Sequence, residues 1–132
     1  MCSSDLTILE RAGVTPWNGI QGKSLLPVLS GAGENAGNAP HNSLLIEEEG
    51  QRRYLGFSER VKARTVLTHE HRLTMYAGAD WGELYDLRND PHECVNLWGD
   101  AGASKLKTEM LGELAQRMLD YTETSPYPDY IA

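Results

Sequence analysis

The sequence is poor in cysteine, in basic residues and in long apolar runs. Its 132 residues include two cysteines, Cys2 and Cys94, which are too few and too far apart to define a disulfide framework. Lysine and arginine total 12 against 19 aspartates and glutamates, and the net charge of -7 argues against nucleic acid or an anionic membrane as a partner. No apolar run is long enough to span a bilayer, and no basic-then-apolar leader is present.

A chain of this length allows one domain with a modest hydrophobic core. Near its start, Leu6, Leu9 and Ala12 have helical spacing and Gly13 is a typical helix stop, so a short N-terminal helix is predicted. Residues 31–42 are mostly Gly, Ala, Asn and Pro with almost nothing to bury, which predicts a flexible surface loop.

Four segments have the composition of β-strands. The first is Ser43–Glu49, and the next two are the arms of a hairpin within Arg60–Gly78 whose tip lies around His69–His71. Trp81–Leu87 adds a further antiparallel edge strand. These segments predict a meander of about four antiparallel strands, which needs one face covered.

The segment that can cover this sheet is an amphipathic helix over Ser104–Tyr121. We expect Ser104 to cap it, because Ser is a favoured N-cap residue. Its apolar stripe consists of Leu106, Met110, Leu111, Leu114, Met118 and Tyr121. The sequence therefore predicts an α+β fold, in which a C-terminal helix covers one face of the sheet and residues 43–132 form the sheet-and-helix domain.

The stretch from Trp81 to Leu97 carries the strongest local signals of the chain. Its strand stops at Asn89-Asp90-Pro91, where Pro fixes φ and removes a donor. Asp90 is a plausible N-cap with Pro91 at N1 and Glu93 at N3, so a capped helical turn is predicted after the strand. Nothing in this arrangement is chemically reactive.

Two groups of residues are candidate cation ligands, each with a simpler alternative. His69 and His71 would point the same way in a strand, as metal ligands do, or they are exposed titrating groups at a hairpin tip. The acidic run Glu47–Glu49 is either a cation site or a solvated strand end, and adjacent residues of a strand point to opposite faces.

Three motifs resemble those of one family. The run Glu-Leu-Tyr-Asp-Leu at 83–87, followed by Asp-Pro, Glu and Asn-Leu, resembles the tail of sulfatases of the alkaline-phosphatase-like superfamily. The hairpin, with Arg-Thr at 64–65 and His-Arg-Leu at 71–73, is similar to a sulfatase hairpin. The first thirty residues also resemble a sulfatase segment, although Leu6 stands where that family usually carries Pro.

The resemblance implies the small C-terminal domain of a sulfatase, without its catalytic machinery. Sulfatases oxidise the Cys or Ser of a Cys/Ser-x-Pro-x-Arg motif to formylglycine and hold a calcium ion beside it. Neither Cys2 nor Cys94 is followed by Pro and Arg at these spacings. The resemblance thus implies no catalytic residue or cofactor in this chain, and calcium and formylglycine in a missing N-terminal catalytic domain. Arg64, His69 and His71 are candidate contacts to the substrate cleft.

Two functions remain open, together with a weaker third. The first is the C-terminal domain of a sulfuric ester hydrolase, which completes the fold and lines one wall of the cleft. The second is a stand-alone binding domain that uses the hairpin and Glu47–Glu49, and the third is a small metalloprotein built on His69 and His71.

Residues 1–30 would be the seam with the catalytic domain. Without that domain, we expect this segment to pair with a second copy, because it carries many apolar side chains that need cover. These are Leu6, Ile8, Leu9, Val14, Ile20, Leu25, Leu26, Val28 and Leu29.

Overall fold

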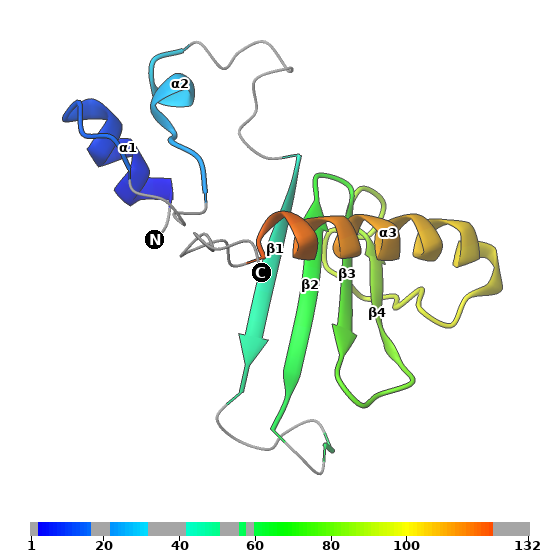
Figure 1. The fold of residues 1–132 in the computed structure, drawn as a ribbon. Helices are drawn as coiled ribbons and strands as arrows, with labels where there is room; N and C mark the ends of the chain where they lie inside the picture. Colours follow the sequence, from blue (N-terminus) through cyan, green and yellow to red (C-terminus); the bar gives the residue numbers. More distant parts are fainter. Residues whose placement is uncertain (1–2, 17–21, 32–41, 51–55, 58–59, 123–132) are drawn as a thin grey trace. The chain divides into compact units, whose positions relative to one another are not determined.

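The fold is given by a computed structural model, shown in Figure 1. The structure describes residues 3–16, 22–31, 42–50, 56–57 and 60–122. Two compact units make up the chain, one of residues 1–41 and 121–132 and the other of residues 42–120. Most of the loop predicted at 31–42 lies outside the described residues. Within the described segments, every helix is too short or too polar to cross a bilayer.

The first unit begins with helix α1, Ser3–Arg11. This helix ends as the sequence predicts, because Gly13 adopts a φ of +69°, which glycine reaches at no steric cost. The left-handed turn lets the backbone N–H of Val14 donate to the carbonyl of Leu9 at 2.9 Å. Glycine thus closes the helix where the periodic apolar residues stop.

A second helix of this unit, α2, is the single turn Leu26–Leu29. The backbone N–H of Leu25 donates to Thr7 Oγ1 of α1 at 2.8 Å, which links the two helices. Ile8 and Leu29 are 67% and 72% exposed, so this unit presents apolar side chains at its surface.

The second unit contains the predicted meander. Strands β1 (Ser43–Glu49), β2 (Lys62–Thr68), β3 (His71–Tyr76) and β4 (Gly82–Asp86) form one sheet in the order β1-β2-β3-β4. Every neighbouring pair is antiparallel. The strand positions and the topology predicted from the sequence are confirmed.

Helix α3, Ser104–Asp120, lies across one face of this sheet, as Figure 1 shows. The core between helix and sheet consists of Val66, Leu73, Leu84, Met110 and Leu114. The three strand residues are 0% exposed. Burial of each large side chain contributes roughly 1.5–3 kcal/mol, so this cluster supplies much of the unit's stability. The predicted cover of one face by the C-terminal helix is confirmed.

The start of α3 differs from the prediction. Ser104 has helical backbone angles, so it lies inside the helical run and is not the cap. A 3-10 turn at Ala101–Ala103 precedes it, and Asp100 caps this turn by accepting from the N–H of Gly102 at 2.8 Å. Both residues are good cap formers, and the extra 3-10 turn moves the cap to the earlier one.

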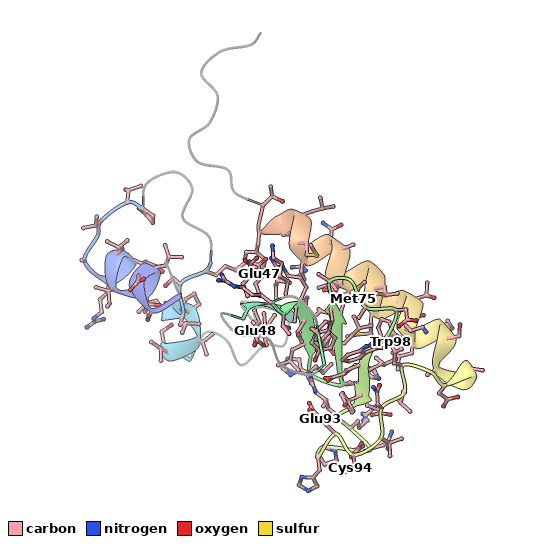
Figure 2. All side chains as sticks on the ribbon, turned by 90° about the horizontal axis from the view of Figure 1, so that it is seen from below. Glu47, Glu48, Met75, Glu93, Cys94 and Trp98 are labelled. Carbon is pink, nitrogen blue, oxygen red and sulfur yellow. The ribbon has the colours of Figure 1, made fainter. Side chains whose placement is uncertain are left out.

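The two faces of the sheet carry different side chains. Figure 2 shows Glu47 and Met75 on the side of α3, with Glu48 and Glu93 on the opposite side. On this opposite face, called the open face below, the centre is made of the small buried residues Ala63, Thr65 and Thr74. The two threonine hydroxyls lie 2.8 Å apart and share a hydrogen bond.

Candidate functional site

The family-like stretch that begins at Trp81 builds a close contact at Gly82. A Cβ atom at this position would lie 2.6 Å from the carbonyl of Thr74 and 2.7 Å from the ring of Trp98. Only glycine leaves room for that approach. Lys107 also holds the tryptophan, since its Nζ donates to the Trp98 carbonyl at 2.8 Å and lies 5.0 Å from the ring centre.

Asn96 completes the outer edge of β4. Its side-chain Nδ2 donates to the carbonyl of Gly82 at 3.0 Å, and its Oδ1 accepts from the N–H groups of Leu84 and Trp98 at 3.0 and 2.9 Å. The N–H of Leu97 then donates to the carbonyl of Leu84 at 2.8 Å. The Asn-Leu of the motif therefore occupies backbone groups that an edge strand would otherwise offer to another chain.

After β4 the chain turns around two carboxylates. Asp86 accepts from Asn89 Nδ2 at 2.7 Å and from the N–H groups of Arg88 and Asn89 at 3.0 Å. The Asn89 side chain is the main reason why the pKa of Asp86 is lowered. Asp90 accepts from the N–H of Val95 at 2.8 Å, and this bond leads the lowering of the pKa of Asp90.

The helical turn predicted after Asp90 is wrong. The N–H of Glu93 donates to the carbonyl of Asp90 at 3.1 Å, which closes a turn, but Glu93 adopts a φ of +54° and the helix cannot continue. Asp90 does cap backbone donors, and it does so across a loop. Glu93 is the one residue other than glycine with a positive φ among those the structure describes.

An ion-pair cluster on the open face explains how Glu93 holds this conformation. Arg72 Nε and Nη2 donate to the two carboxylate oxygens of Glu93, each at 2.7 Å, in a bidentate pair. Arg72 Nη1 lies 3.1 Å from Glu83 Oε2, and the guanidinium carbon lies 4.8 Å from the ring centre of Tyr85. The hydrogen bond to Glu93 is the main cause that raises the pKa of Arg72.

Sequence reasoning missed this cluster. Arg72 and Glu93 are 21 residues apart, and their pairing requires both the hairpin and the left-handed turn. The one available signal is that both residues belong to motifs that resemble the sulfatase family. The cluster ties the loop after β4 to the open face, so the motif orders a loop.

Arg64 faces the helix side of the sheet. Its Nε lies 2.8 Å from Glu47 and its Nη2 lies 3.1 Å from Glu49, so these two carboxylates hold a guanidinium. Arg64 also lines a groove of about 320 Å³ beside α3, together with Lys62, Met75 and Leu114. The acidic run is thus a strand end whose alternate residues pair with Arg64.

His69 and His71 lie at the other end of β2. His69 is exposed in the turn, and His71 is the first residue of β3, opposite Asp86 in the register. Among the residues that the structure describes, no group of three His, Cys, Asp or Glu side chains could hold a metal ion. About 13 Å of strand separates Arg64 from the end of β2, so the two histidines and Arg64 do not form one site.

Three aromatic rings gather at the Arg64 end of the sheet. Tyr76 lies 4.8 Å from Trp81 and 5.6 Å from Phe57, measured between ring centres, and Phe57 and Trp81 are also 5.6 Å apart. The Tyr76 hydroxyl donates to Glu83 Oε1 at 3.0 Å. This aromatic cluster therefore adjoins the ion-pair cluster through Glu83.

The comparisons with known proteins agree on one family. Residues 3–120 match the family model described as "N-sulphoglucosamine sulphohydrolase, C-terminal". The chain is 30% identical over 130 residues to an N-acetylglucosamine-6-O-sulfatase of Bacteroides thetaiotaomicron, and the match covers 91% of this chain and 21% of that protein.

Solved structures of sulfatases have the same fold. One is a sulfatase in complex with its substrate D-glucosamine-2-N,6-O-disulfate, with a TM-score of 0.72 and 26% identity over 94% of this chain. Another is described as a 2-O GAG sulfatase, with a TM-score of 0.73 and 25% identity over 90% of this chain. This chain covers 24% of each of those two chains. Because the family model matches residues 3–120 of this chain, the chain belongs to that family of sulfatase C-terminal domains, the N-sulphoglucosamine sulphohydrolase C-terminal family.

Proposed function

We propose that this chain is the C-terminal domain of a sulfuric ester hydrolase that acts on sulfated amino sugars, and that it is not catalytic alone. The observation that carries the proposal is the family match over residues 3–120. Two of its relatives, an N-acetylglucosamine-6-O-sulfatase and a sulfatase bound to a glucosamine disulfate, are about four to five times as long as this chain, which covers 21% and 24% of them. The proposed substrate class follows from the substrates of these two relatives.

The chemistry belongs, in this proposal, to a separate catalytic domain. Among the described residues, no three His, Cys, Asp or Glu side chains gather as they would at a calcium site rich in carboxylates. The described residues do not fit a formylglycine site either, since Cys94 is followed by Asn96 and Trp98 where the motif needs Pro and Arg. The proposed role of the domain is therefore to complete the fold and to shape one wall of the substrate cleft.

The surface of the first unit supports a seam with another domain. Ile8, Val28 and Leu29 are 67%, 45% and 72% exposed, which is typical of side chains that find cover against a partner. In this proposal, residues 1–30 pack against the catalytic domain. In the isolated chain, the same side chains favour self-association.

Arg64, His69 and His71 are the proposed cleft contacts. His69 is exposed and its ring N–H can donate to a sulfate or hydroxyl oxygen, whereas a ligand would compete with Glu47 and Glu49 for Arg64. Arg64 lies toward one end of β2 and the two histidines lie beyond the other end, so a single sugar would contact either Arg64 or the histidines.

Two experiments test the proposal. The purified chain should give no turnover of nitrophenyl sulfate, and turnover that a substitution within the chain abolishes would refute the non-catalytic role. In the longer polypeptide that carries this domain, His69→Ala and Arg64→Ala should be compared for KM and kcat. Loss of a cleft contact should raise KM. Unchanged KM and kcat for both variants and for His71→Ala would refute the cleft role.

A further inference from the structure

The aromatic cluster of Phe57, Tyr76 and Trp81 has a feature that a packing role does not require. Its three rings come from separate segments, one before β2, one at the end of β3 and one just before β4. Trp81 is nevertheless 41% exposed, so a large aromatic surface remains uncovered by the described residues. An aromatic ring that is anchored on one side and open on the other is a rigid surface for stacking.

Polar groups beside the cluster are held in place. Glu83 accepts from the Tyr76 hydroxyl at 3.0 Å through one oxygen and pairs with Arg72 at 3.1 Å through the other. A carboxylate has about four lone-pair positions, so these two contacts leave acceptor capacity for further donors. The ion pair with Glu93 fixes Arg72 in turn. Acceptors are therefore pre-organised at the rim of an apolar platform.

We propose that Phe57, Tyr76 and Trp81 form a stacking subsite for a pyranose ring of the saccharide, with ring hydroxyls donating to Glu83. A pyranose presents a C–H face that suits an aromatic ring and hydroxyls at its edge that suit a carboxylate. The nearby Glu83 and Glu93 disfavour a sulfate group at this position, so the subsite takes a neutral part of the sugar. The inference rests on the proposed function, since a sulfatase domain would meet such a ligand.

The test is titration of the ¹⁵N-labelled chain, followed by NMR of the indole N–H signals of its three tryptophans. The probes are glucosamine, D-glucosamine-2-N,6-O-disulfate and inorganic sulfate. Both sugars should shift the Trp81 signal and the amides of Tyr76 and Gly82 in a saturable way, and leave Trp98 in place. Inorganic sulfate should leave all of these signals unchanged.

Variants separate stacking from general binding. Trp81→Leu should weaken saccharide binding about three- to tenfold, measured on the amide of Tyr76, whereas Trp81→Phe should keep most of it because a ring remains. Val95→Ala is the matched control, since Val95 is an exposed apolar residue like Trp81 but lies outside the aromatic cluster. The amide spectrum of each variant verifies that the sheet is folded.

Three results would overturn the proposal. They are the absence of a saturable shift with either sugar, an equal shift with inorganic sulfate, and undiminished binding by Trp81→Leu. If Trp81→Leu lowers the stability of the chain but still binds the saccharide as the wild type does, the cluster is a packing element or a contact to another domain. Sulfate ester turnover by the isolated chain would refute the non-catalytic role and leave the Trp81 shift standing, so the two failures are distinguishable.

Discussion

Gly82→Ala tests whether the family-like motif acts through close packing. The backbone of Gly82 does not have a positive φ, so an alanine fits the strand conformation and only crowding opposes it. The added Cβ would meet the Thr74 carbonyl at 2.6 Å and the Trp98 ring at 2.7 Å, and both atoms are held by other contacts. Overpacking of this kind costs about 1–3 kcal/mol, so the urea midpoint of the chain should fall clearly.

The matched control is Gly112→Ala in α3. A Cβ there meets nothing within 4 Å, so the substitution should stabilise the chain by about 0.5–1 kcal/mol through helix propensity alone. Trp98→Leu should restore part of the stability that Gly82→Ala loses, as measured in a double-mutant cycle. The rescue should be incomplete, because the close contact with the Thr74 carbonyl remains. Wild-type stability of Gly82→Ala would refute the packing argument.

Four further predictions follow from the same contacts. Arg72→Met should lower the free energy of unfolding by about 1–3 kcal/mol, and Arg72→Lys should restore only part of it because lysine lacks the bidentate fork; an unchanged urea midpoint would contradict the ion-pair cluster. The lowered pKa of Asp90 means that its contribution is complete above the ordinary value of 3.8 and is lost as the pH falls below it, so Asp90→Asn should flatten the acid loss of stability between pH 5 and 2. If His69 and His71 bind no metal, a chelator should leave the melting temperature unchanged, and a drop restored by zinc would overturn that expectation. Light scattering should show self-association through residues 1–30, and a strict monomer with strong hydrogen-exchange protection there would contradict the seam.

The sheet and α3 could be predicted from the sequence because each depends on short-range periodicity. Leu73 lies between the polar residues Arg72 and Thr74, and Met110 and Leu114 are one helical turn apart, so local patterns indicate that these side chains form the core. The cap before α3 was predicted at Ser104, whereas the structure has it at Asp100, since both are cap formers and the 3-10 turn between them decides. Short-range sequence patterns do not show that a 3-10 turn precedes a helix and moves its cap to an earlier residue.

The loop after β4 could not be predicted, because its conformation depends on a distant partner. Asp90, Pro91 and Glu93 have the residue types of a capped helix, and by local preference a helical turn would form. The bidentate pair with Arg72 instead stabilises Glu93 at a φ of +54°, a conformation that costs a non-glycine residue roughly 1–2 kcal/mol. Tertiary contacts therefore override the local signal at this point.

The position of this loop gives the motif a structural role in a sulfatase domain. Core packing against α3 covers one face of the sheet, and Asn96 and Leu97 occupy backbone groups of the β4 edge. The surfaces that remain for the proposed contacts are the open face and the two ends of the sheet. Arg72 and Glu83 fix the side chains of the open face, and Glu83 joins them to the aromatic cluster. The motif thus makes rigid the surface at which we propose that sugar is bound, since a fixed side chain loses less conformational entropy when a ligand arrives.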